Sequence, residues 1–489
     1  MVLTCAEMKA LEARAFADGV SAEALMEEAG TRIAAAVHQF LPRPGRCVVH
    51  FGKGHNGGDA LVAARHLAAR GWVLELRPAF PPEAWAELTR RKHQQLGAVS
   101  PKSSGPDTAI LDGLLGIGAG GPLREPIRGA TRTINRSRAE TDARVFAIDL
   151  PSGLDGDTGA ADADAVQADY TLTIGCAKPG LLADAAASFV GRLAILPLDE
   201  LTARLPNSSA AAQLATPGTL KNLLPRRPFD THKGDCGRVG IIAGSAGLTG
   251  AAVMCAEAAV HAGAGLVTLY VTSDIHAVVS AKISPEVMVK PVRTYKGVLT
   301  AKHDVLVVGP GLGRGRDAEV LEVLARAPQP MVIDADALNA LSSRLDLIAT
   351  AGGPRLLTPH PGEMQRLVPA SEARARRQVV EEFTQCYNVT LLLKGARTVI
   401  GQRGRPLSYN TTGSPGMATG GMGDVLSGVC GALAGQKLDL YDAARLGAWL
   451  CGRAAELALA TGESEESLSA THVIAQLGGA FRELRAGGY

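Results

Sequence analysis

Aromatic side chains and net charge are both scarce in this chain. Only 4% of its 489 residues are aromatic, whereas 57 are glycine, so backbone turns rather than bulky side chains are expected to shape its binding sites. The 50 basic residues are balanced by 48 acidic ones. No nucleic-acid partner is therefore expected, because such a surface needs a basic patch. The basic run at 374–377 is interpreted as a solvated helix face.

Paired cysteine spacings and long apolar runs are also missing. The eight cysteines form neither a CxxC pair nor a Cys/His cluster at zinc spacing, so we predict neither a disulfide framework nor a structural zinc site. The apolar run from Ala251 is interrupted by Glu257 and His261, so no membrane span is expected. The N-terminus lacks an apolar signal core. These absences favour a reducing, cytoplasmic location.

The chain is longer than the roughly 250–300 residues at which a single core stops growing, so its length predicts more than one domain. Residues 202–218 lose apolar periodicity and gather Pro, Ser, Ala and Asn, as expected of a connector. We predict a first domain over 1–205, a linker over 206–217 and a second domain over 218–489.

The stretch 410–428, NTTGSPGMATGGMGDVLSG, combines a glycine-rich turn, one acid and a helix start. Its glycines let successive N–H groups point at one anion. Val425, Val429 and Leu433 follow at helical spacing, so the turn lies at a helix N-terminus, which also favours negative charge. Asp424 is thereby placed as a general base in phosphoryl transfer. The alternative is that Asp424 only caps the helix.

Three strand-loop units of one plan occupy the first half. CVVHFG at 47–52 predicts a buried strand, which a glycine loop with Asn-Gly-Gly-Asp at 56–59 follows; a second strand ends at Asp112 and a third at Asp149. Glycines 52, 54 and 57 also satisfy the dinucleotide fingerprint G-x-G-x-x-G, a weak signal alone. Acids at the ends of parallel strands occupy the ligand crevice of an open α/β sheet, although each one alone is equally a turn former.

Both halves are predicted to be α/β. Apolar runs at 171–174 and 193–196 complete a parallel sheet with helices on both faces, a Rossmann-like three-layer domain. Strands recur in the second half, and each ends in a glycine, an acid or a histidine. Asp334 and Asp336 would face the same side of an extended chain, which suits Mg²⁺ near a nucleotide; alternatively, Asp336 caps the helix from Ala337.

Several motifs together resemble the bifunctional NAD(P)H-hydrate repair enzyme family, in which an epimerase is fused to a ribokinase-like dehydratase. They are HKGDCGRVGIIAGS at 232–245, GPGLG at 309–313, and the glycine turn at 410–428. The NGGD at 56–59 resembles the epimerase motif NNGGDG, with His55 and Ala60 in place of its first Asn and last Gly. Ser414 and Met422 also depart from the family pattern, which usually has Asn and commonly Thr or Ser there.

The resemblance implies epimerisation of the R and S forms of hydrated NADH or NADPH, and dehydration of the S form at the expense of ADP. It implies that Asp149 touches the altered ring as a catalytic residue, and that K⁺ is held by Asn56, Asp112 and Ser152, although no residue distinguishes K⁺ from Na⁺. The substrate loops would be His55, Asn56, Gly57, Gly58 and Asp59, and Gly116, Ile117, Gly118, Ala119, Gly120, Gly121 and Pro122.

In the second domain the resemblance implies that Asp424 is catalytic and that Mg²⁺ accompanies ADP. Substrate would touch Ala252, Gly313, His360 and Asp424. The nucleotide would bind Lys394, Gly395, Ala396, Arg397, Thr398 and Gly423. No residue decides between ADP and ATP.

Two other functions stay open at this point. One is a ribokinase-type small-molecule kinase that releases a stable phosphorylated product, fused to a dinucleotide-binding domain. The other is a non-catalytic dinucleotide sensor. The expected partners are small molecules, with neither nucleic acid nor membrane, and a homo-oligomer is expected.

Overall fold

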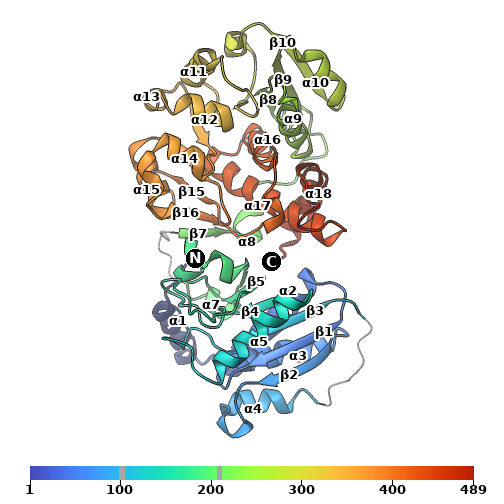
Figure 1. The fold of residues 1–489 in the computed structure, drawn as a ribbon, viewed down its shortest axis with the longest axis vertical. Coiled ribbons are helices and arrows are strands. Elements are labelled where there is room, and N and C mark those ends of the chain that lie inside the picture. The colour runs from blue at the N-terminus through green and yellow to red at the C-terminus, as the bar shows by residue number, and fades with distance from the viewer. Residues whose placement is uncertain (98–104, 206–211) are drawn as a thin grey trace. The chain divides into compact units, whose positions relative to one another are not determined.

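The computed structural model describes residues 1–97, 105–205 and 212–489. The chain forms two compact units, Met1–Ala210 with Tyr489 and Ala211–Gly488 (Figure 1). The first contains a six-stranded sheet and the second a ten-stranded sheet. The described helices include none that is long and apolar enough to cross a membrane.

The sheet of the first unit is parallel throughout, in the order β2-β1-β3-β4-β5-β6. Its strands are β1 (Arg46–Phe51), β2 (Val73–Pro78), β3 (Thr108–Gly113), β4 (Arg144–Ile148), β5 (Tyr170–Ile174) and β6 (Arg192–Leu196). Its helices are α1 (Cys5–Ala17), α2 (Ala22–Phe40), α3 (His55–Ala68), α4 (Glu87–Gln94), α5 (Ile127–Glu140), α6 (Ala187–Val190) and α7 (Asp199–Thr202). Short 3-10 turns are η1 (Pro82–Ala84), η2 (Pro179–Leu182) and η3 (Asp184–Ala186).

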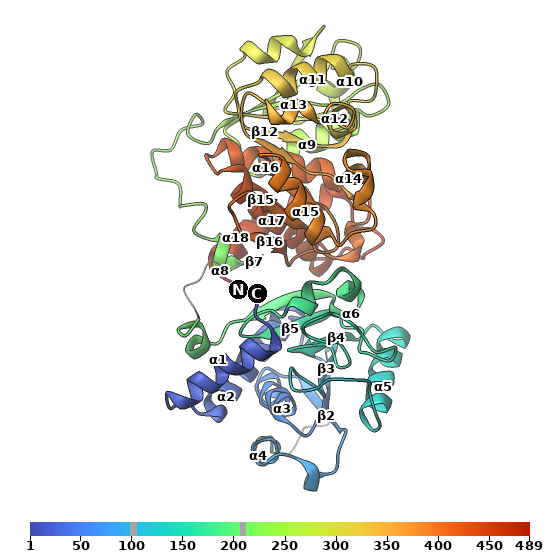
Figure 2. The same ribbon diagram turned by 90° about the vertical axis from the view of Figure 1, so that its left-hand side faces the viewer.

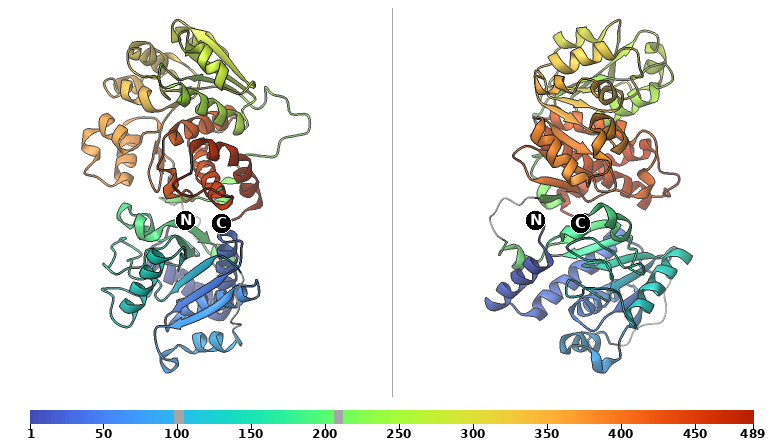
Figure 3. Two further views of the ribbon diagram at one scale, coloured as in Figure 1. Left: turned by 45° about the vertical axis from the view of Figure 1, so that its right-hand side comes forward. Right: turned by 60° about the vertical axis from the view of Figure 1, so that its left-hand side comes forward.

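Helices cover both faces of this sheet, as Figures 1 and 3 show. Side chains of α2 and α3 form one core with one face of the strands, and side chains of α5 form a second core with the other face. Strands buried on both faces need near-continuous apolar runs, such as the one in β1. The predicted three-layer, Rossmann-like α/β architecture is confirmed.

The sheet of the second unit runs β10-β9-β8-β11-β12-β13-β14-β15-β16-β7, and only β15 is antiparallel to its neighbours. Its strands are β7 (Ala212–Ala215), β8 (Arg238–Ile242), β9 (Leu266–Thr272), β10 (Val287–Val292), β11 (Val305–Val308), β12 (Met331–Ile333), β13 (Arg355–Leu357), β14 (Thr390–Leu393), β15 (Val399–Gln402) and β16 (Leu407–Asn410).

Helices cover this second sheet on both faces too, and Figures 1 and 2 show α15 and α17 on opposite sides of it. The helices are α8 (Pro217–Leu220), α9 (Thr249–His261), α10 (His276–Lys282), α11 (Asp317–Arg326), α12 (Ala335–Leu341), α13 (Asp346–Ala349), α14 (Pro361–Leu367), α15 (Arg376–Cys386), α16 (Met422–Gly435), α17 (Leu440–Ala460) and α18 (Ala470–Ala486). The 3-10 turns are η4 (Tyr295–Thr300), η5 (Pro369–Ser371) and η6 (Pro415–Met417).

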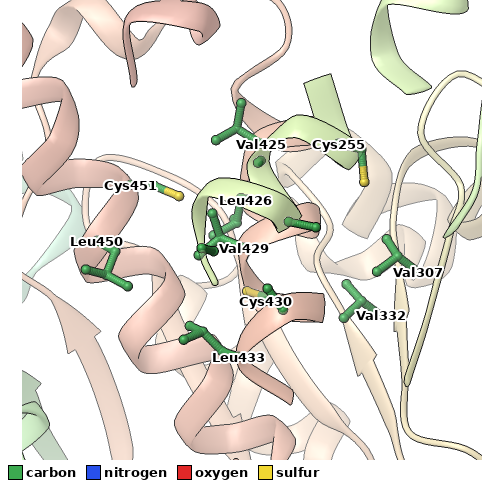
Figure 4. Packing of buried hydrophobic residues seen from close by; sticks show 14 of the residues in the cluster. Cys255, Val307, Val332, Val425, Leu426, Val429, Cys430, Leu433, Leu450 and Cys451 are labelled. Carbon is green, nitrogen blue, oxygen red and sulfur yellow. The ribbon is translucent and has the colours of Figure 1, made fainter. Parts of the chain in front are cut away.

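Helix α16 lies at the centre of the second core (Figure 4). Val425, Val429 and Leu433 are fully buried, as their spacing predicted. The helix packs between α9, α17 and strand β11. A helix that is apolar on all sides is stable only in such a setting. The burial of α16 therefore fixes the position of the glycine turn at its N-terminus.

The predicted linker, 206–217, differs from the structure in its second part. Residues 206–211 lie outside the described residues, but Ala212–Ala215 form β7, and α8 begins at Pro217. Strand β7 pairs in parallel with β16 at the edge of the ten-stranded sheet. A four-residue, alanine-rich strand is stabilised by that pairing and not by its own propensity, which explains why its composition resembles a connector.

In each sheet the strand order reverses at one point: between β1 and β3 in the first unit, and between β8 and β11 in the second. Ligands of open α/β sheets bind outside the carboxyl ends of the strands at such a switch point. The rule places the ligand sites of this chain at the carboxyl ends of the strands beside these two switch points.

Candidate active sites

The first switch point lies beside the N-terminus of α3, which follows β1 after a short turn. Residues 55–59, predicted as a glycine loop, form the first turn of this helix instead. A Cβ on Gly57 would lie 2.3 Å from the carbonyl oxygen of Gly52, and one on Gly58 would lie 2.4 Å from the terminal carbon of Met26. The two glycines therefore let α3 pack closely against α2 and the turn after β1. The predicted loop at 116–122 is present between β3 and α5, and it is exposed from Gly118 to Pro122.

Asn56, Asp112 and Ser152 are brought together at the switch point. Ser152 donates from Oγ to Asp112 Oδ1 at 2.7 Å and from its backbone N to Asp112 Oδ2 at 2.8 Å. The amide N of Leu115 donates to Ser152 Oγ at 3.0 Å, and the carbonyl of Leu115 accepts from Asn56 Nδ2 at 2.8 Å. One short hydrogen-bonded chain thus joins the three predicted metal ligands.

Asp112 is fully buried, and no ion pair to it is found in residues 1–97, 105–205 and 212–489. Burial raises the pKa of its carboxyl to about 6, although the hydrogen bonds from Ser152 and Leu114 act in the opposite direction. Burying an uncompensated carboxylate is costly. A carboxylate, a hydroxyl and an amide oxygen suit a hard cation, so these residues fit the predicted alkali ion.

Asp149 follows β4 directly, in a left-handed backbone conformation with φ of 67°. Its Oδ1 accepts from the backbone N of Ile174 at 3.1 Å and from the ammonium of Lys178. Lys178 was not foreseen from the sequence; the only signal was a lysine in the apolar segment after β5. Burial, together with the negative charges of Asp149 and Glu12, holds the pKa of Asp59 well above its ordinary value. These contacts make a compact acidic site with one buried cation.

In the second unit, Asp424 lies in the first turn of α16 and does not cap it. The cap is Gly421, which has a φ of 90°, and no hydrogen bond to the Asp424 carboxylate is found in the described part of the chain. Burial and the charge of Asp334 raise the pKa of Asp424 to about 6, against the opposing effect of Lys394. The alternative of a simple helix cap is therefore wrong, and the carboxylate is available to a ligand.

Lys394, at the end of β14, is held beside Asp424 by other carboxylates. Its Nζ lies 2.9 Å from Asp334 Oδ1 and 3.7 Å from Glu363 Oε2. Ser427 Oγ donates to Asp334 Oδ2 at 2.8 Å. Although burial alone would lower the pKa of Lys394, these acids raise it. A Cβ at position 423 would lie 3.3 Å from Nζ, so Gly423 leaves room for the ammonium at the helix start.

Asp334 and Asp336 do not share one side of an extended chain. Strand β12 ends at Ile333, and Ala335, with a φ of 48°, turns the backbone into α12. Asp336 Oδ2 instead accepts the backbone N–H of Gly313 at 2.8 Å. The alternative, that Asp336 caps a helix from Ala337, also differs from the structure. Helix α12 begins at Ala335, so Asp336 lies inside its first turn, and its carboxylate binds the backbone of a neighbouring loop. No cluster of His, Cys, Asp or Glu able to hold a metal is found among the described residues.

The other predicted contacts are placed as follows. His360 caps α14, because its Nδ1 accepts from the backbone N of Gly362 at 3.1 Å, and its side chain stays half exposed. Ala252 has no accessible surface, so a substrate contact there would require α9 to move.

Residues 394–398 form the turn between β14 and β15. Ala396 is exposed in it and Arg397 is buried. A Cβ on Gly395 would lie 2.0 Å from Nη1 of Arg376. Arg376 therefore lies against this turn, which corrects its interpretation as part of a solvated helix face.

Comparisons with known proteins relate separate parts of the chain to two family models. A family model described as NAD(P)H-hydrate dehydratase matches residues 239–477, and one described as YjeF-related protein N-terminus matches residues 22–180. The bifunctional NAD(P)H-hydrate repair enzyme Nnr of Moorella thermoacetica is 36% identical over 93% of this chain and 92% of its own length. The Nnr enzyme of Escherichia coli K12 is 36% identical over 90% and 86%.

Among solved structures, a ribokinase-like superfamily protein from Enterococcus faecalis superposes with a TM-score of 0.50 at 26% identity. The superposed region covers 57% of this chain and 99% of that protein. The predicted ribokinase-like fold of the second unit is thereby confirmed.

Proposed function

This chain belongs to the family of bifunctional NAD(P)H-hydrate repair enzymes, and we propose that its first unit epimerises hydrated NADH and NADPH while its second unit dehydrates the S form. It is an enzyme of metabolite repair. The observation that carries the assignment of the sites is the Asp424 carboxylate, which has no hydrogen-bond partner among the described residues and lies beside Lys394 at a glycine-capped helix start.

Dehydration needs a better leaving group than hydroxide. The substrate hydroxyl sits on a carbon bonded to the ring nitrogen. Asp424 takes the hydroxyl proton while the oxygen bonds to the terminal phosphorus of ADP and AMP leaves. The nitrogen lone pair then expels phosphate, and the adjacent ring carbon loses a proton to restore the reduced nicotinamide. A pKa of about 6 for Asp424 suits a base that must be ionised near neutrality and still accept a proton.

Charge and open backbone groups support nucleotide binding next to this base. Lys394 supplies a cation, and the turn at 395–398 and the N–H groups at Gly423 can point at phosphate oxygens. Asp334 and Asp336 are engaged by Lys394 and Gly313, so Mg²⁺ is proposed to be held mainly by nucleotide phosphates and water. Its charge would neutralise the transferred phosphoryl group. ADP rather than ATP is the donor that the family resemblance favours.

Epimerisation requires reversible chemistry at the same hydrated carbon. Asp149 accepts the hydroxyl proton as the carbon–nitrogen bond breaks, and the nitrogen keeps the electron pair, which is delocalised into the carboxamide. The nitrogen then adds to the other face of the new carbonyl, and Asp149 returns the proton to oxygen. The substrate is proposed to lie across the start of α3 and the exposed loop at 116–122.

K⁺ is proposed to be held by Asn56, Asp112 and Ser152, where its charge would compensate the buried carboxylate. The small-molecule substrates are hydrated NAD(P)H and ADP. A cytoplasmic location and a homo-oligomeric state remain proposals, the first from cysteine usage; light scattering on the purified protein tests the second.

A crossed pair of variants tests the division of labour. With both epimers, ADP and Mg²⁺, the Asp149→Asn protein should restore reduced-nicotinamide absorbance at the normal initial rate and stall when the S form is consumed. Asp424→Asn should restore no absorbance, with dehydration lowered about 10²–10⁴-fold, and should still interconvert the epimers.

Chromatographic separation of the epimers at early times, before spontaneous epimerisation interferes, provides the second readout. Identical time courses for Asp149→Asn and the unchanged enzyme would remove Asp149 from the first site. Near-normal dehydration by Asp424→Asn would remove Asp424 from the second. Each outcome leaves the other assignment intact, because the two residues belong to different units.

A further inference from the structure

Lys178 is a buried lysine that the proposed chemistry leaves without a role. It precedes η2 and is only 1% exposed. Its Nζ donates to Asp149 Oδ1, to Thr173 Oγ1 at 3.1 Å and to the carbonyl of Ile174 at 3.1 Å. An ammonium has three protons to donate, so all of them are engaged. Lys178 therefore has no proton free for a substrate and no lone pair to act as a base.

The contacts of Asp149 fall on one side of its carboxylate. Lys178 Nζ, the backbone N of Ile174 and, at 3.4 Å, Thr173 Oγ1 all donate to Oδ1. No hydrogen bond to Oδ2 is found in the described ranges. The backbone of Asp149 is in the left-handed region, a strained conformation that persists only where surrounding structure enforces it. One oxygen is anchored, and the other is left for a ligand.

We propose that Lys178 is a positioning residue for epimerisation, which anchors Oδ1 of Asp149 and presents Oδ2 to the hydroxyl of the hydrated ring. This inference rests on the proposed role of Asp149. The proton transfer is the one already described: the hydroxyl proton moves to Oδ2 and returns after ring closure. The ammonium neither gains nor loses a proton in the cycle.

The charge balance around Asp149 explains why a cation is needed. Two other acids face it, Glu12 from α1 and Asp59 from α3, and burial together with the charge of Asp149 raises the pKa of each. The thiol of Cys5 also faces it, and burial and Asp157 raise its pKa to about 11. Lys178 is the only cation that the structure places in contact with Asp149 in the described ranges. Without it, ionising Asp149 would add a negative charge to a buried acidic cluster.

The test is epimerisation of the S form without ADP, followed by chromatography over a range of pH. Lys178→Met should lower the rate about 10²–10⁴-fold, as for loss of a working base. The acid limb of the pH–rate profile of this variant should also move to higher pH, since the Asp149 carboxylate loses the cation that favours its charged form. Dehydration of the S form should remain normal. A purely structural role predicts a lower rate with an unchanged acid limb, and that result would overturn the proposal.

Lys92→Met is the matched control. Lys92 is also a buried lysine of the first unit, and its Nζ lies 2.7 Å from Glu27 Oε1. Losing it removes two ion pairs, with Glu23 and Glu27, in which Asp149 takes no part, so it should cost stability without moving the acid limb. A shift of the limb in Lys92→Met as large as in Lys178→Met would refute a specific role.

Thr173→Val provides a second route if Lys178→Met does not fold. This buried hydroxyl accepts from Lys178 and contacts Asp149, and valine has nearly the same shape. We expect a smaller rate loss and a limb shift in the same direction; an unchanged rate and limb would refute the proposal. Full activity of Asp149→Asn would instead refute the proposed function itself, so the two failures are distinguishable.

Discussion

Potassium should stabilise the first unit at neutral pH and lose that effect in acid. The cation is expected to bind at Asp112, which is buried without an ion-pair partner among the described residues. Burial raises the pKa of this carboxyl from 3.8 to about 6. Because the folded-state pKa is raised, the contribution of Asp112 to stability is fully present below the unfolded-state pKa and is lost as pH rises through about 6. A bound cation should restore it.

The size of the effect follows from the shift. Each pKa unit corresponds to about 1.4 kcal/mol, so ionising Asp112 in the folded protein costs about 3 kcal/mol. The stabilisation by K⁺ itself depends on its concentration and its dissociation constant, because a ligand of the folded state alone stabilises by RT ln(1 + [L]/Kd). Below the unfolded-state pKa Asp112 is protonated in both states, so K⁺ has little charge to compensate.

Thermal unfolding of the full chain, with and without K⁺, measures this difference at several pH values. Two of the three tryptophans, Trp72 and Trp85, belong to the first unit, so their fluorescence reports its unfolding. Tetramethylammonium chloride at the same ionic strength controls for screening, because that cation is too large and too weakly solvated by oxygen ligands to replace K⁺.

Asp112→Asn supplies the second control. The amide keeps the shape of the side chain but loses one hydrogen bond with Ser152, so its absolute stability is not informative. The change with K⁺ and pH is informative, and it should vanish in this variant. A stabilisation by K⁺ that is equal at pH 4 and pH 7.5, or that persists in Asp112→Asn, would refute the reasoning.

Two further predictions concern the second unit. A fragment that begins at 206 should fold and dehydrate, whereas one that begins at 218 lacks β7, exposes the edge of β16 and should be less soluble with a lower melting temperature; equal behaviour would show that β7 is dispensable. Dehydration at saturating ADP should fall as pH drops through about 6, where burial and Asp334 place the pKa of Asp424, and Asp334→Asn should move this acid limb to lower pH. An unmoved limb would mean that another group controls the rate.

The layers of the fold could be predicted because they depend on local patterns. Continuous apolar runs identified β1, β5 and β6, and helical spacing identified the buried face of α16. Strand β7 could not be predicted, since four residues rich in alanine carry no periodicity and gain their order from β16. The order of the strands also depends on which runs meet in space, about which periodicity says nothing.

Glycine was a partly misleading signal. Its abundance at 54–58 predicts a phosphate loop, but Gly57 and Gly58 lie inside α3 because the helix approaches neighbouring atoms too closely for a Cβ. The turn before Asp424 met the prediction, with Gly421 in the left-handed conformation at the helix start. Close packing of a helix and a left-handed turn both require glycine, so the sequence pattern is the same. Only the packing partners in the structure distinguish the two.

The sequence predicts the acids of both proposed sites, but it does not identify the lysines that contact Asp149 and Asp334 as their partners. Lys178 and Asp149 are 29 residues apart, and Lys394 and Asp334 are 60 apart. Each lysine follows a later strand whose carboxyl end lies at the same edge of the sheet as that of the acid. Such pairs depend on topology, so a lysine after a buried strand must be judged against the acids at the ends of neighbouring strands.

The two pairs have opposite consequences for the chemistry proposed at each site. In the first unit the lysine is bound directly to Asp149, the proposed reacting acid, so one oxygen of that carboxylate is anchored by the contact. In the second unit the lysine is bound to Asp334, which is not the reacting group, and burial and the charge of Asp334 raise the pKa of Asp424 to about 6. Such a base is ionised near neutrality and can still accept a proton during phosphoryl transfer. Because Lys394 is paired with Asp334 and not with Asp424, the carboxylate of Asp424 stays available to the substrate proton, and the ammonium of Lys394 can contact phosphate.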